Sequence, residues 1–205
     1  MLIPSKTGEG ELIEKKSRFI SNCFYIESEQ EAAEKIQYLR KKYWDSRHVV
    51  YAFVLADGTA RFSDDNEPHG TAGKPVLSVI QGADLKNCLI TVVRYFGGTL
   101  LGTGGLVKAY GESAKLALLD SGIAETVTLS VIRVVCAYDQ YEKLVRLITL
   151  AGGTDIVADY GENIEIKFVL EEEKRQDFEK NLTENFSARL KAEKCGEKTG
   201  KIQKI

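Results

Sequence analysis

Two segments of this 205-residue sequence concentrate side chains that could do chemistry. The first spans residues 64–75 and contains three carboxylates within four positions, at Asp64, Asp65 and Glu67. Carboxylate oxygens are the ligands that Mg²⁺ prefers, so these three residues are candidate metal ligands and Mg²⁺ is a candidate cofactor. Crowded like charges also raise a carboxyl pKa and can create a general acid or base, with the nearby His69 as its partner.

A structural interpretation of the same segment stands beside the catalytic one. Asp side chains bind backbone N–H groups in turns, and the glycines supply positive φ angles. In that case the acidic residues shape the loop and take no part in chemistry.

The second segment is rich in glycine, follows a predicted strand and leads into a predicted helix. Glycine lets the backbone approach a ligand, and a helix start offers free N–H donors and a partial positive charge. The candidate anion ligands here are Gly97, Gly98, Gly102, Thr103, Gly104 and Gly105. The segment lacks the P-loop lysine and a dinucleotide-binding glycine pattern. Alternatively, the glycines only let the helix pack tightly on the sheet.

Arg94 is a charge inside an otherwise apolar strand, which is costly unless the charge is paired. Its expected partners are the carboxylates of the acidic segment. Three further residues, Arg18, His48 and Lys74, complete the cationic ligand candidates. Among nearby aromatic residues, Tyr51, Tyr95, Phe96 and Tyr110 are candidate stacking surfaces for bases. Alternatively all four are core residues, which is the interpretation we favour for Phe96.

Hydrophobic periodicity and turn residues predict two α+β domains, at residues 1–126 and 127–205. For the first domain we expect strands at 11–15, 19–26, 49–55, 59–63 and 88–96, and helices at 28–43, 75–80 and 106–119. For the second we expect strands at 128–137, 155–160, 164–170 and 188–195, and helices at 140–151 and 174–186. This β-α-β-β-α-β order is that of a ferredoxin-like domain, followed by a flexible tail at 198–205.

Composition excludes several classes of protein. The net charge of −2 provides no general field for polyanions, so a nucleic-acid site would have to be local. No apolar run approaches the length of a membrane span, and no signal peptide is evident. The four cysteines are widely spaced and are predicted to be free thiols in the cytoplasm.

Several longer motifs together resemble the IMPACT family and its bacterial, YigZ-like members. They are Ser17-Arg18-Phe19, His48-x-x-Tyr51-Ala52, Asp64-Asp65-x-Glu67-Pro68-x-Gly70-Thr71-Ala72-Gly73-x-Pro75 and Arg94-Tyr95-Phe96-Gly97-Gly98-x-x-Leu101-Gly102-x-Gly104-Gly105-Leu106. The resemblance implies an N-terminal β-α domain similar to the superfold of a ribosomal protein and of elongation factor G domain IV. The C-terminal part resembles the family only in its predicted element order. Asn66 and His69 stand where the family more often has Gly and Ser.

The resemblance implies a binding protein without an assigned biochemical activity. Our leading hypothesis is that the chain binds RNA, the ribosome or a translation factor through the glycine-rich turn and Arg94, and so modulates translation. The alternative is a metal- or acid/base-dependent enzyme that acts on a small phosphorylated or peptide-like ligand.

Overall fold

The computed structural model of the chain describes residues 1–204, which divide into two compact units. One unit contains residues 1–125 together with residues 202–204, and the other contains residues 126–201. Each unit combines strands with helices, which confirms the predicted two-domain α+β class. Within residues 1–204, no helix has both the length and the apolar content needed to cross a membrane.

The N-terminal unit is built on a sheet with the strand order β2-β3-β6-β4-β5, in which neighbouring strands are antiparallel. Its strands are β2 (Gly8–Glu14), β3 (Ser17–Tyr25), β4 (His48–Val54), β5 (Ala60–Ser63) and β6 (Cys88–Tyr95). Its helices are α1 (Glu29–Lys42), α2 (Gly73–Gly82) and α3 (Gly102–Ser121). A short strand that the sequence did not predict, β1 (Leu2–Pro4), pairs with the start of β7 (Ile123–Cys136).

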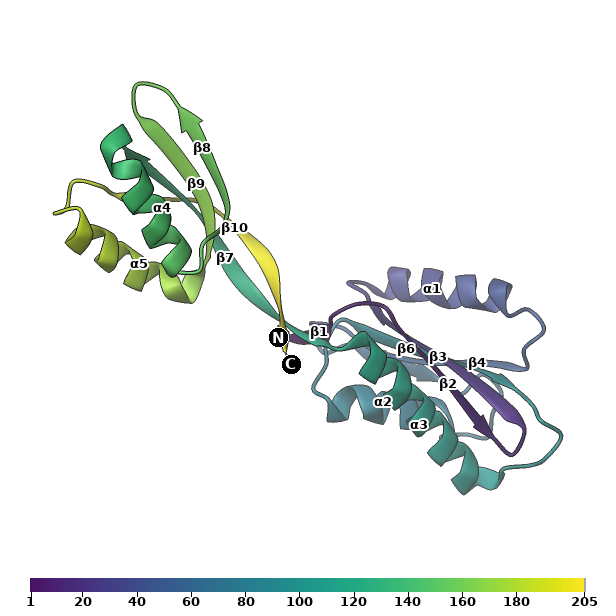
Figure 1. The fold of residues 1–205 in the computed structure, drawn as a ribbon. Helices are drawn as coiled ribbons and strands as arrows, with labels where there is room; N and C mark the ends of the chain where they lie inside the picture. Colours follow the sequence, from purple (N-terminus) through teal and green to yellow (C-terminus); the bar gives the residue numbers. More distant parts are fainter. Residues whose placement is uncertain (205) are drawn as a thin grey trace. The chain divides into compact units, whose positions relative to one another are not determined.

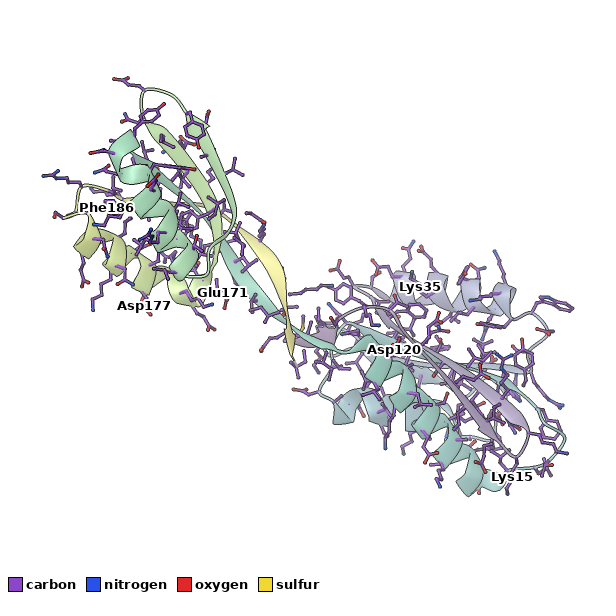
Figure 2. The ribbon with its side chains drawn as sticks, viewed as in Figure 1. Lys15, Lys35, Asp120, Glu171, Asp177 and Phe186 are labelled. Atoms are coloured by element: carbon purple, nitrogen blue, oxygen red, sulfur yellow. The ribbon has the colours of Figure 1, made fainter. Side chains whose placement is uncertain are left out.

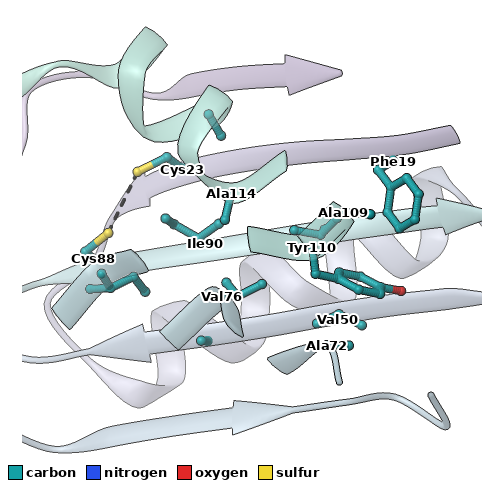
Figure 3. Packing of buried hydrophobic residues seen from close by; sticks show 14 of the residues in the cluster. Phe19, Cys23, Val50, Ala72, Val76, Cys88, Ile90, Ala109, Tyr110 and Ala114 are labelled. Atoms are coloured by element: carbon teal, nitrogen blue, oxygen red, sulfur yellow. Dashed lines mark hydrogen bonds between the residues drawn. The ribbon is translucent and has the colours of Figure 1, made fainter. Parts of the chain in front are cut away.

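Helix α1 covers one face of this sheet, and α2 and α3 cover the other (Figure 1). Successive strand side chains point to opposite faces. Val50 and Val92 therefore belong to the large core under α2 and α3, whereas Val49 and Val93 pack on the side of α1. Figure 3 shows the large core, in which the ring of Tyr110 lies among aliphatic side chains.

The starts of the three helices follow local sequence signals to different degrees. The predicted cap of α1 is confirmed, because the Ser28 hydroxyl accepts the N–H of Glu31. Helix α3 begins at Gly102 and not at Leu106 as predicted. The buried side chains of Leu101 and Leu106 fix this first turn against the core. Four residues of low helix propensity, 102–105, therefore still become helical. Helix α2 likewise begins two residues earlier than predicted.

The C-terminal unit has the predicted β-α-β-β-α-β order and the strand order β10-β7-β9-β8 of a ferredoxin-like sheet. Its elements are β7 from Thr126 onward, α4 (Tyr141–Leu150), β8 (Thr154–Tyr160), β9 (Ile164–Glu171), α5 (Glu172–Asn185) and, up to Lys201, β10 (Ala192–Lys204). Phe168 of β9 and Phe178 of α5 meet edge to face in its core, with ring centroids 5.1 Å apart. In Figure 2, Lys35 and Asp177 mark solvent-exposed faces of α1 and α5.

The predictions for the C-terminus were partly wrong. The last strand begins at Ala192 and not at residue 188, because Ser187 and Ala188 have positive φ angles and form the turn that ends α5. The N–H of Ala188 bonds back to the carbonyl of Thr183 in this turn. Residues 198–204 of the predicted flexible tail belong to β10, which pairs with β7, and the last residue of that prediction lies outside the described chain.

Candidate functional site

Asp64 holds the acidic segment in shape. Its carboxylate accepts hydrogen bonds from the backbone N–H groups of Gly70, Ala72 and Gly73 at 2.8, 3.1 and 2.8 Å. Burial by itself raises the pKa of Asp64, but these three N–H groups favour the charged form and leave its pKa below the usual value. Asp64 therefore behaves as the structural interpretation of this loop expects.

Asp65 connects the segment to two neighbouring elements. One carboxylate oxygen accepts from Arg40 of α1 at 2.8 Å, and the other accepts from the N–H of Val49 at 2.7 Å. Asp65 adopts a left-handed conformation, with φ of 42°. Its own carbonyl lies 2.7 Å from Nδ1 of His48, and because a carbonyl only accepts, Nδ1 carries the hydrogen and Nε2 is left for other contacts.

Glu67 is the centre of a buried polar cluster. Its Oε1 atom accepts from Arg94 Nη1 at 2.6 Å and from the Tyr110 hydroxyl at 2.8 Å. Nε2 of His48 lies 3.6 Å from the same oxygen. Burial, followed by the charge of Glu67, raises the pKa of Tyr110, so its hydroxyl keeps its proton and donates it.

The predicted metal cluster does not form. Asp64, Asp65 and Glu67 bind separate sets of donors, so their carboxylates do not converge on one point. Within residues 1–204, no group of three or more His, Cys, Asp or Glu side chains is arranged to hold a metal ion. The arrangement of these residues therefore gives no support to Mg²⁺ as a cofactor.

Arg94 pairs with the acidic segment as the sequence predicted. Besides its bond to Glu67, it donates from Nη2 to the Ser17 hydroxyl at 3.4 Å. Its guanidinium lies over the rings of Phe19 and Phe96, 5.5 and 5.7 Å from their centroids. The Nε–H group is buried and has no hydrogen-bond partner among the described residues. Arg94 thus retains one donor that the protein does not use.

The glycine-rich turn approaches the hairpin between β2 and β3 very closely. A Cβ atom on Gly97 would lie 2.0 Å from the carbonyl carbon of Lys16, so only glycine fits there. The N–H of Gly97 donates to the Ser17 hydroxyl at 3.2 Å. Gly98 and Gly102 adopt positive φ angles of 83° and 75°.

The first turn of α3 offers donors without acceptors. No side chain caps this helix. The N–H groups of Gly102, Thr103 and Gly104 have no acceptor within the described part of the chain. A helix start in this state carries a partial positive charge.

A cavity of about 510 Å³ joins the acidic segment to the glycine-rich turn. It brings together His48, Glu67, Arg94, Gly102 and Thr103, all of them predicted site residues. The other residues that line it are Arg47, Asn66, Pro68, Phe96, Leu100, Leu101 and Leu106. Two segments some thirty positions apart in the sequence therefore form the walls of one cavity.

Several predicted site residues do not line this cavity. Arg18 forms an exposed ion pair with Glu11, and His69 is 97% exposed and lies beside Asp64. Lys74 lines a different cavity. The remaining residues outside it are Asp64, Asp65, Gly97, Gly98, Gly104 and Gly105.

Sequence reasoning also misplaced one aromatic residue and missed several residues of other types. Phe96 was expected in the core, but it is 42% exposed at the cavity wall because it follows the end of β6. Of the two interpretations left open for Tyr110, the core position is confirmed, because the residue is fully buried. Ser17 and Arg47 were not predicted as site residues. Ser17 stands in one of the family motifs, which was the available signal, whereas nothing in the sequence marked Leu100 at the cavity.

Fold and site define a two-domain α+β protein with an arginine-centred cavity at a glycine-rich helix start. The family model of the Impact N-terminal domain matches residues 15–118, and that of a domain of unknown function, DUF1949, matches residues 134–189. This chain belongs to the IMPACT family.

Individual relatives support this assignment. The chain is 35% identical over 181 residues to IMPACT family member YvyE of Bacillus subtilis, covering 87% of this chain and 83% of that one. It is 38% identical over 183 residues to an IMPACT family member of Haemophilus influenzae, covering 86% of this chain and 87% of that one. A crystal structure of a hypothetical protein matches with a TM-score of 0.60 and 32% identity, over 95% of this chain and 97% of that one.

Proposed function

We propose that the N-terminal unit binds a phosphate group of RNA in the 510 Å³ cavity, and that the protein modulates translation by docking on RNA, the ribosome or a translation factor. The observation that carries the proposal is that Arg94, whose buried Nε–H has no partner among the described residues, lines the same cavity as the uncapped start of α3. Both are donors suited to an anion.

The surroundings of these donors fit a nucleotide better than a bare anion. Arg47 is exposed at the cavity wall and has no carboxylate partner among the described residues, so it can pair with a phosphate. Phe96 offers half-exposed ring surface on which a base can stack. The step from RNA to translation rests on the family resemblance, which links this domain to a ribosomal protein and an elongation factor.

The test is the affinity of the chain for fluorescently labelled single-stranded RNA, measured by anisotropy as salt is raised. For one phosphate in the cavity, log affinity should fall with log salt at a slope of about −0.7. Arg47→Ala and Phe96→Ala should each weaken binding by about tenfold, since one charged contact or one stacked base is worth about 1–3 kcal/mol.

The matched control is Lys41→Ala, which removes an exposed cation of α1 that does not line the cavity. It should leave RNA affinity unchanged. Absence of RNA binding at low salt, or equal losses in Arg47→Ala and Lys41→Ala, would overturn the proposal. Purified ribosomes, tested with the same variants, distinguish free RNA from an assembled particle as the target.

A second candidate function is favoured by one observation, namely that His48 and Glu67 both line the cavity. With Nδ1–H held by the Asp65 carbonyl, Nε2 of His48, which lies 3.6 Å from Glu67 Oε1, is the nitrogen left to act as a base on a small phosphorylated or peptide-like ligand. A panel of nucleotides in a thermal-shift assay, with and without Mg²⁺, tests this. A ligand present at 100 times its Kd stabilises the fold by about 2.7 kcal/mol.

A further inference from the structure

A second and larger cavity lies in the N-terminal unit, in the groove between α2 and α3. It measures about 750 Å³ and is separate from the arginine-centred cavity. Its lining includes Lys74, Val79 and Gly82 of α2 and Val107, Gly111, Lys115 and Leu118 of α3.

Small residues keep this groove open. A Cβ atom on Gly82 or on Gly111 would meet nothing within 4 Å, so each glycine leaves space where most residues would project a side chain. The groove is not required for packing of the core, because α2 and α3 already bury their inner faces against the sheet.

The floor of the groove is apolar and accessible. Val79 and Leu118 pack against the large core on one side and line the groove on the other. Val107 is 43% exposed at its wall. Exposed apolar surface in a concave site is the feature that apolar faces of partner helices recognise.

The walls of the groove carry only positive charge. Lys74 stands on α2 and Lys115 on α3, and no Asp or Glu lines the groove. Neither lysine has a carboxylate partner among residues 1–204, whereas Lys108, outside the groove, lies 3.9 Å from Glu112. In a chain with a net charge of −2, this local excess of cations is complementary to an acidic partner.

We propose that the groove between α2 and α3 binds an acidic amphipathic helix of a partner protein. Helix α2 has 10 residues, which corresponds to about 15 Å, so the groove accommodates about three turns of such a helix. Apolar side chains at positions i, i+3 or i+4, and i+7 enter the groove, and carboxylates on both flanks face Lys74 and Lys115. The groove is concave, which favours a helix over a flat membrane surface.

The experiment uses the full chain and two matched probes. Both are fluorescent 14-residue helical peptides with leucines along one face, one bearing glutamates and the other lysines on its flanks. The glutamate peptide should bind at least about tenfold more tightly than the lysine peptide, because like charges across an interface are costly. The proposal is overturned by equal binding of the two, or by no binding of the glutamate peptide.

Two pairs of variants locate the binding. A Cβ atom at Gly111 meets nothing within 4 Å, so Gly111→Phe should place its ring in the groove and abolish binding, whereas Gly111→Ala leaves the groove open and should bind as before. The double charge reversal Lys74→Glu with Lys115→Glu should weaken binding by about tenfold or more, while Lys41→Glu on α1 should not. Thermal unfolding of each variant verifies that it is folded.

The remaining outcomes also decide the proposal. Equal binding by Gly111→Phe and Gly111→Ala would place the peptide elsewhere and overturn it. Binding of anionic vesicles that is lost in Gly111→Phe would also overturn it, because the groove would then bind a membrane surface. Self-association of the free chain that the glutamate peptide does not disrupt would overturn it as well, because a second copy of the chain would then occupy the groove. Because the groove is separate from the arginine-centred cavity, Gly111→Phe should leave RNA affinity unchanged, which distinguishes failure of this proposal from failure of the first.

Discussion

Arg94 and Glu67 form an ion pair with Nη1 and Oε1 2.6 Å apart, although 27 positions separate them in the sequence. Their side chains are only 6% and 4% exposed. The Tyr110 hydroxyl bonds to the same carboxylate oxygen, so β6, the acidic segment and α3 are connected through a single atom. The cavity is thereby organised before any ligand arrives, which reduces the cost of ordering it on binding.

Replacing Glu67 with Gln should destabilise the N-terminal unit by about 3–5 kcal/mol, because a buried arginine loses its counter-charge. Urea unfolding measures this free energy. The control is Glu11→Gln in the exposed pair with Arg18, where we expect little change because solvent screens the pair. Adding Arg94→Met to Glu67→Gln should recover part of the loss. Wild-type stability of Glu67→Gln would contradict the role of the pair.

Replacing Asp64 with Asn should cost about 1–3 kcal/mol at neutral pH, since three N–H groups lose a charged acceptor. The pKa of Asp64 is lowered in the folded state. The stability that the Asp64 carboxylate adds to the folded protein is therefore complete above the pKa of the unfolded state, about 3.9. It is lost as the pH falls through the lower pKa of the folded state. Urea unfolding from neutral to acidic pH should show wild type and Asp64→Asn converging. A difference that is constant across that range would exclude this linkage.

The sequence predicted most of the fold because its signals were local. The Ser28 cap, the continuous apolar runs of β4 and β6, and the element order of the C-terminal unit all depend on neighbouring residues. The start of α3 could not be predicted this way. Burial of Leu101 and Leu106 in the core decides it, and tertiary packing overrides the low helix propensity of glycine.

The site was predicted in part for the same reason. A charged side chain in an apolar strand is costly unless it is paired, and for this reason the acidic segment was the expected partner of Arg94. It could not single out Glu67 among three neighbouring carboxylates, since the choice depends on how Asp64 and Asp65 are engaged elsewhere. Nor could composition show that Arg18 pairs with Glu11, away from the cavity.

Replacing Gly97 with Ala should destabilise the protein more than the same change at the adjacent Gly98. A Cβ atom at Gly97 would lie 2.0 Å from Lys16 backbone, which must shift, and overpacking of this kind costs about 1–3 kcal/mol or more. At Gly98 the space is open, and only the positive φ of 83° opposes alanine, by about 1–2 kcal/mol. Thermal unfolding of the two variants ranks them. A larger loss of stability in Gly98→Ala than in Gly97→Ala would show that the glycine-rich turn makes room for the added Cβ atom without a shift of the hairpin between β2 and β3.

The four free thiols should divide into one reactive and three protected groups. Cys195 is exposed in β10, whereas Cys23, Cys88 and Cys136 are buried. A hydrogen bond to Cys23 and burial raise the pKa of Cys88 well above its usual value, and burial raises that of Cys136, so neither supplies the reactive thiolate. Ellman's reagent should titrate one thiol in the native protein and all four in denaturant. Cys195→Ser should leave none reactive in the native state, and rapid labelling of that variant would show that the cores open to solvent on the timescale of the assay.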